Sequence, residues 1–332
     1  MSQAAVSTDS WLNSLQLLYP VPEAYRVPQL DTREALEVLR CGPEILGELL
    51  AAGLPHTEGP DGILFDRNDL INLALNSGTG LSMPERAVRF ALRWMREDPK
   101  TWENSLNWKF SIQLSNPDSD DTSTWSHNRF LPEVTGGMIE HWESTAPARI
   151  TPDFFEFSGK GPVTFSGQIR TEGKLQGLRS PRLREITQEF LDTGYRWARL
   201  PKGCQMDYET VLANKVAPCV SASLYLEKQF RDAGYEANTR GGWILGMLDL
   251  GHSWVEVVDD DGITKPVDAV FERLSLLTEN PHPDLPTACL GSRINRLLPA
   301  AMPAGEPGAI HTNEGQSAPA MTQTIIRRMG VR

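Results

Sequence analysis

The sequence predicts an α+β protein. Through about the first hundred residues, apolar side chains recur at three- and four-residue spacing, which is typical of amphipathic helices. Farther along, the segments KFSIQL and PVTFSGQI alternate apolar and polar residues, which is typical of half-buried strands. Between residues 204 and 275, one helical stretch precedes three strand-like stretches. Together these patterns predict helices packed on an antiparallel sheet.

The amino-terminal region, residues 1–104, is expected to form a helical domain. Asp31 precedes the periodic segment TREALEVL and is a candidate helix cap. Either Asp66 or Asn68 caps a later helix, after the strand-like segment ILF. Ser82 opens the segment SMPERAVRFALRWMREDP, which is the most regular helix pattern of the region.

Residues 33–75 resemble the small helix-turn-helix domains of the excisionase and MerR type. That resemblance leaves open a DNA-binding regulator. However, residues 1–100 carry nine Lys or Arg against 14 Asp or Glu. A surface that neutralises phosphates needs the opposite excess. We therefore interpret this region as a docking or site-shaping module and regard nucleic acid as an unlikely partner.

The composition excludes several other classes of protein. The 332 residues carry a net charge of −11, contain no apolar run of the ~18 residues that a membrane helix needs, and begin without a secretory signal pattern. The four cysteines form no C-x-x-C pair, and His127 and His141 lack ligand spacing, so no metal site is expected. We expect reduced thiols, a cytoplasmic location and no cofactor.

One cysteine stands in a chemically suggestive position. Pro218 and Cys219 open a helical pattern, and Pro is well tolerated at a helix start. The positive end of the helix dipole favours a thiolate there, and the N–H groups of the first turn can hold an oxyanion. Packing is the expected role of the remaining cysteines, Cys41, Cys204 and Cys289.

A histidine and an aspartate follow in a pattern that brings them together. His252 opens the strand-like segment HSWVEVV, and Asp268 ends the next strand after the turn sequence DDDG. An antiparallel hairpin would return Asp268 to the side of His252. Asp268 could then orient the imidazole, whose other nitrogen would face the Cys219 sulfur. A thiol nucleophile, a base and an orienting carboxylate are the groups of covalent acyl transfer.

The ordered set of segments resembles the transglutaminase-like core of the papain-like cysteine enzymes. The matching segments are the helix that Cys219 opens, GYEA, HSWVEV and VD, the last ending at Asp268. The resemblance implies a papain-like transglutaminase core over residues 105–299. Residues 105–179 would extend that core or cover its cleft. After Pro299 the composition turns to Ala, Pro, Gly and Gln, so residues 300–332 are expected to be a flexible tail.

The same resemblance implies a catalytic triad with Cys219 as the nucleophile, His252 as general base and acid, and Asp268 as the orienting group. Asn214 is a candidate oxyanion donor. Trp254 is expected to be core or to shield the ion pair, and Trp243, in a glycine-rich segment, is a candidate pocket residue. The family often has Gly before the cysteine, where this chain has Pro218, and a Trp before the aspartate, which is absent here.

We expect an acyl donor that is an amide, an ester or a carrier-protein thioester. The favoured reaction is amide-bond formation onto an amine acceptor, as in bacterial natural-product biosynthesis; that preference rests on family analogy. Hydrolysis by a cysteine peptidase or amidase is the first alternative. A DNA-binding or interaction protein with an inactive core is the second. The oligomeric state is not predicted.

Overall fold

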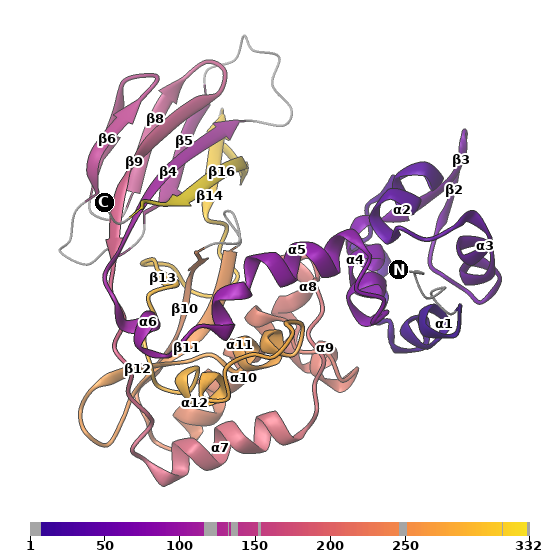
Figure 1. The fold of residues 1–332 in the computed structure, drawn as a ribbon. Helices are drawn as coiled ribbons and strands as arrows, with labels where there is room; N and C mark the ends of the chain where they lie inside the picture. Colours follow the sequence, from indigo (N-terminus) through magenta and orange to yellow (C-terminus); the bar gives the residue numbers. More distant parts are fainter. Residues whose placement is uncertain are drawn as a thin grey trace.

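The computed structural model describes residues 8–115, 125–131, 133, 139–151, 154–245, 251–313 and 315–330. The protein is α+β and has a helical amino-terminal part, a central part of helices on a four-stranded sheet, and a β part (Figure 1). Within the described ranges, no helix is both long enough and apolar enough to cross a bilayer.

The amino-terminal part surrounds a three-stranded sheet of order β1-β3-β2 and has its own apolar core. Asp31 forms a capping box with Glu34, and the side chain of Asp66 accepts the N–H of Asn68, so Asp66 caps the later helix. Along the chain, two helices are followed by a hairpin and a further helix. The elements are α1 (Thr8–Leu17), η1 (Glu23–Tyr25), β1 (Pro28–Leu30), α2 (Thr32–Leu39), α3 (Pro43–Ala51), β2 (Thr57–Gly59), β3 (Gly62–Asp66) and α4 (Arg67–Asn76).

The predicted boundary at residue 104 cuts through the central core. The buried residues of the amino-terminal core end at Ala74, whereas Trp94 and Trp102 pack in the core of the central part. The reason is the size of the indole rings, which bury most of their apolar surface when a second layer of structure covers them, as the central part does here. The linking elements are α5 (Met83–Ala91), η2 (Arg93–Arg96) and α6 (Lys100–Glu103).

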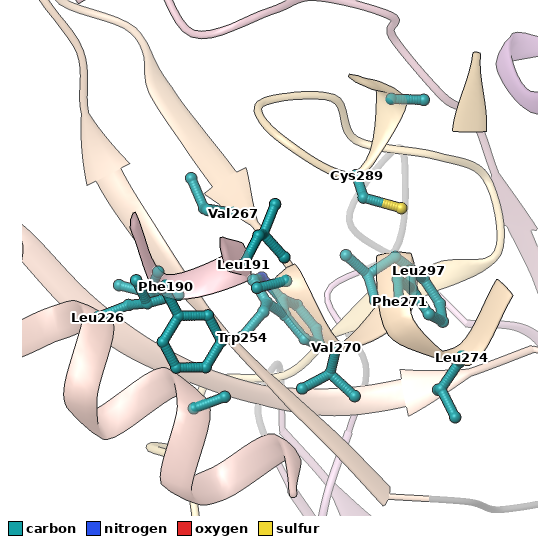
Figure 2. Close-up of a cluster of buried hydrophobic side chains, with 14 of the residues drawn as sticks. Phe190, Leu191, Leu226, Trp254, Val267, Val270, Phe271, Leu274, Cys289 and Leu297 are labelled. Atoms are coloured by element: carbon teal, nitrogen blue, oxygen red, sulfur yellow. The ribbon is translucent and has the colours of Figure 1, made fainter. Parts of the chain in front are cut away.

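The central part packs helices on an antiparallel sheet of order β12-β11-β10-β13. Its core surrounds Trp254, with Leu226 of α10 and Phe271 of α11 among the buried side chains (Figure 2). The helices are α7 (Pro181–Asp192), α8 (Lys202–Met206), α9 (Tyr208–Ala213), α10 (Cys219–Asp232), α11 (Ala269–Ser275) and α12 (Leu285–Ala288). The strands are β10 (Ala237–Ile244), β11 (Gly251–Val258), β12 (Thr264–Val267) and β13 (Leu297–Pro299).

The β part consists of two sheets, of order β15-β14-β5-β8-β7 and β16-β4-β9-β6. Phe155 of one sheet stacks on Phe165 of the other with ring centroids 4.2 Å apart, so the apolar faces of the sheets meet. The strands β4 to β9 thus form two layers together with strands from the end of the chain, and the core between them also includes Trp243 and Leu298. The strands up to residue 171 are β4 (Leu106–Ser115), β5 (Trp125–Phe130), β6 (Glu140–Ser144), β7 (Ala148–Ile150), β8 (Phe154–Gly159) and β9 (Val163–Thr171).

The expectation of a flexible tail over residues 300–332 is wrong for most of that segment. The chain returns to the β part as β14 (Ala309–Asn313), β15 (Gln316–Pro319) and β16 (Met321–Arg328). Strand β14 pairs with β5, and β16 pairs with β4 through eight aligned residues. Composition misled the prediction because a polar, Pro-rich segment can be ordered by ladder hydrogen bonds to strands more than a hundred residues earlier.

Candidate active site

Helix α10 begins at Cys219. Pro218 is its N-cap, with φ −68° and ψ 164° and no side-chain hydrogen bond to the helix. The hydroxyl of Ser223 donates to the Cys219 carbonyl at 2.6 Å. Cys219 is partly exposed, whereas the next residues, Val220 and Ser221, are buried. The helix therefore presents its first side chain toward solvent while the rest of its first turn packs inward.

The predicted hairpin is present, and it brings Asp268 to the face of His252. Strands β11 and β12 are antiparallel, with Val255 opposite Val267. Side chains alternate along each strand, so His252 and Asp268 lie on the face opposite these two valines. The hairpin turns at Gly262, whose φ of 73° suits glycine and whose N–H donates to the Asp259 carbonyl.

Asp268 holds two partners with its two carboxylate oxygens. Its Oδ2 accepts a hydrogen bond from Nε2 of His252 at 2.6 Å, and both side chains are about 3% exposed. Its Oδ1 accepts the N–H of Phe271 at 3.0 Å, which caps α11. The backbone N–H of Asp268 donates to the Cys289 carbonyl. The aspartate is therefore held by the helix start as well as by the imidazole.

The same imidazole interacts with the Cys219 thiol. Burial on its own would lower the pKa of His252. The charge and hydrogen bond of Asp268 raise it, and the hydrogen bond and charge of Cys219 add to that effect. The resulting pKa of His252 is about 10. Because Nε2 is bonded to Asp268, Nδ1 is the ring nitrogen left for the sulfur. The imidazole therefore carries its proton at neutral pH beside the Cys219 sulfur.

Aromatic rings enclose the imidazole. The ring of Phe271 stacks on His252 at a centroid distance of 5.1 Å, and Trp254 lies at 6.0 Å on the same strand face. Trp254 is 2% exposed, and its indole N–H donates to Glu256. These rings exclude water from the His252–Asp268 pair, which strengthens the electrostatic interaction within it.

Gln205 also belongs to the site, although no sequence pattern pointed to it. Its Oε1 accepts the N–H of Val220 at 3.2 Å and lies 3.9 Å from the Cys219 sulfur. Its Nε2 donates to the Leu200 carbonyl, and its backbone carbonyl accepts the hydroxyl of Ser221. Gln205 thus clamps the first turn of α10 and presents a carbonyl oxygen, an acceptor, to the thiol.

Comparisons with known proteins give one distant likeness. No protein-family model and no curated protein matches the sequence. A solved structure from Cytophaga hutchinsonii, described as a "Putative Cysteine Protease", matches with a TM-score of 0.44 at 11% identity and covers 69% of this chain and 92% of that chain. The likeness is too distant to assign an activity. The contacts around Cys219 carry the functional argument instead.

Two further residues lie elsewhere than the sequence suggested. Asn214 ends α9, is exposed, and donates its amide to the Thr210 carbonyl, so its amide is engaged by its own helix. Trp243 pairs with Gly251, so its ring points to the face of the sheet opposite His252. There it joins the core of the β part, beneath the guanidinium of Arg129. Neither residue remains a candidate for the pocket.

The other thiols lie in settings that disfavour their ionised form. Burial raises the pKa of Cys41 to about 11, and burial followed by the charge of Asp207 raises that of Cys204. Burial, with the charges of Asp268 and Glu272, raises the pKa of Cys289 well above its usual range. Among the residues that the structure describes, no group of three His, Cys, Asp or Glu side chains could hold a metal ion.

Proposed function

We propose that this protein is a cysteine-dependent acyl-transfer enzyme that forms a thioester on Cys219. One observation carries the proposal: Asp268 holds Nε2 of the buried His252 imidazole at 2.6 Å, and the Cys219 thiol lies near enough to that imidazole to help raise its pKa. A positioned nucleophile, base and orienting group are the parts that such chemistry requires.

In the first half-reaction, the Cys219 thiolate attacks the carbonyl carbon of an amide, ester or thioester. The oxyanion that forms would be held by N–H groups at the start of α10, where the helix dipole favours negative charge. The His252 imidazolium then donates its Nδ1 proton to the leaving amine, alcohol or thiol. The high pKa of His252 supports this role, because the ring carries its proton at neutral pH before the reaction begins.

In the second half-reaction, neutral His252 takes a proton from the acceptor as it attacks the thioester. Asp268 stabilises the imidazolium that forms again and keeps the ring aligned. An amine acceptor would give an amide, and water would give an acid. We favour the amine acceptor, which the family resemblance implies and with which the protein would be a transferase.

Mass spectrometry of the intact protein tests the thioester. The protein is incubated with acyl N-acetylcysteamine thioesters and p-nitrophenyl esters of several chain lengths and then quenched in acid. We expect one added acyl group, located on the peptide that contains Cys219 and absent from a Cys219→Ala variant. Cys289→Ala is the matched control and should still be acylated. An adduct that persists in Cys219→Ala, or no adduct from any donor, would refute the proposal.

The fate of the thioester separates transfer from hydrolysis. The acylated protein is mixed with small primary amines, and the amide and acid products are measured by liquid chromatography and mass spectrometry. We expect amide to exceed acid at millimolar amine. Acid as the sole product with every amine would make the protein a hydrolase with the same nucleophile.

A further inference from the structure

Helix α5 carries an unusual outward surface where it links the amino-terminal and central parts (Figure 1). Met83, Arg86, Phe90 and Arg93 follow one another at spacings of three and four residues and are all exposed. Met83 is 45% exposed and Phe90 is 67% exposed. We call these four residues the α5 face; the first three lie in α5, and Arg93 begins the short helix η2 that follows it. Exposed apolar side chains that gather on one side of a surface, unlike ones that lie singly, mark candidate contact sites for a partner.

The charge of this segment is opposite to that of the whole chain. Residues 83–96 contain four arginines and one acidic residue, Glu85, whereas the protein has a net charge of −11. Glu85 is buried in the capping box with Ser82 and faces away from solvent. The segment is therefore a basic region on an acidic protein.

Two of the arginines are neutralised and two are not. Arg89 and Arg96 share the carboxylate of Glu279, at 3.2 and 3.8 Å. In the described part of the chain, no carboxylate forms an ion pair with Arg86 or Arg93. The free positive charge of the segment thus lies on the α5 face itself.

Arg93 and Phe90 form a single contact unit. The guanidinium carbon of Arg93 lies 4.1 Å from the centre of the Phe90 ring, and its Nη1 donates to the Phe90 carbonyl at 2.6 Å. The arrangement holds the guanidinium and the ring together at the surface, so little side-chain freedom remains to be lost on binding. Arginine and aromatic side chains of this kind dominate the binding energy at protein interfaces.

From these observations we propose that the α5 face docks an acidic amphipathic helix of a protein partner. The carboxylates of such a helix would pair with Arg86 and Arg93, and its apolar side chains would cover Met83 and Phe90. Nucleic acid fits less well, because two free arginines neutralise few phosphates. The proposal does not depend on the activity of Cys219.

Fluorescence anisotropy on the full-length protein tests the docking. The probe is a labelled synthetic helix of 18 residues with Leu on one face and Glu on the other, and its charge control has Gln in place of Glu. We expect the Glu peptide to bind at least tenfold more tightly than the Gln peptide, and its binding to weaken between 50 and 300 mM NaCl. The double variant Arg86→Glu/Arg93→Glu and the variant Phe90→Ser should each weaken binding at least tenfold.

A double variant with the same change in charge controls for nonspecific attraction. Arg33→Glu/Arg182→Glu reverses two exposed arginines on α2 and α7, and its binding should match that of the unchanged protein. Equal binding by Arg86→Glu/Arg93→Glu would overturn the proposal, as would failure of the unchanged protein to bind the Glu peptide. The unchanged protein could instead bind duplex DNA or phosphatidylglycerol vesicles and not the peptide. If Arg86→Glu/Arg93→Glu lost that binding, the α5 face would belong to another class of partner, and the proposal would also be overturned.

Discussion

The carboxylate of Asp268 links the His252 imidazole to the start of a helix: one oxygen lies 2.6 Å from Nε2 of His252, and the other accepts the N–H of Phe271 at 3.0 Å. Substitution Asp268→Asn separates these two roles. Asparagine keeps an oxygen to cap α11, and Asn and Asp are about equally good caps. The substitution removes the negative charge that raises the pKa of His252 against the lowering effect of burial. The pKa of His252 should therefore fall.

We therefore expect Asp268→Asn to retain its fold and to lose about 10²- to 10⁴-fold in acyl transfer, the range that general acid–base catalysis contributes. The rate of Cys219 alkylation by iodoacetamide, measured from pH 5 to 10, should fall near neutral pH, because His252 would no longer carry its proton beside the sulfur. An unchanged alkylation profile would show that Asp268 serves only as a helix cap. Asp268→Ala, which loses both roles, should also be less stable.

The four thiols should differ widely in reactivity. Iodoacetamide at pH 6.5, followed by peptide mass spectrometry, should label Cys219 at least tenfold faster than any other cysteine. The physical reason is that burial raises the pKa of Cys41, Cys204 and Cys289, whereas Cys219 is partly exposed beside a protonated imidazole. His252→Ala should abolish the selectivity, and equal labelling of the four thiols in the unchanged protein would contradict the proposed site.

Stability should fall at alkaline pH through His252. Its folded-state pKa of about 10 lies above the ordinary value of 6.5, so the folded protein binds this proton more tightly than the unfolded chain does. The resulting stabilisation is fully present below pH 6.5 and is lost as pH rises through about 10. Urea unfolding at pH 6, 8 and 10 should show a steeper loss for the unchanged protein than for Asp268→Asn. Parallel loss in the two proteins would exclude His252 as the source.

Gly242, which lies opposite His252 on strand β10, should not tolerate a side chain. A Cβ atom there would lie 2.2 Å from the Leu298 carbonyl oxygen and 2.7 Å from the Trp254 ring. Gly242→Ala should therefore destabilise the protein by about 1–3 kcal/mol, the usual cost of overpacking. Gly47→Ala is the control: it lies within α3 with no atom within 4 Å of its Cβ position, and it should stabilise by ~0.5–1 kcal/mol. Chemical denaturation measures both, and equal effects would refute the steric argument.

Local patterns in the sequence were sufficient for much of the site. The helix start at Cys219, the strand that His252 opens and the hairpin that returns Asp268 depend on capping, on period-two alternation and on a turn, all of which act between near neighbours. The sequence could also exclude a basic surface over the amino-terminal region as a whole, because net charge is a sum over residues. It could not show that the free arginines gather on one helix face.

Only the tertiary structure decided the rest. Gln205 reaches the start of α10 from a separate short helix, Trp243 points to the far face of the sheet, and strands β14 and β16 pair with strands near the beginning of the β part. Each of these depends on contacts between segments distant in sequence, where packing and ladder hydrogen bonds override local composition. The sequence by itself therefore determined which side chains could perform the chemistry, and tertiary packing decided which of them meet.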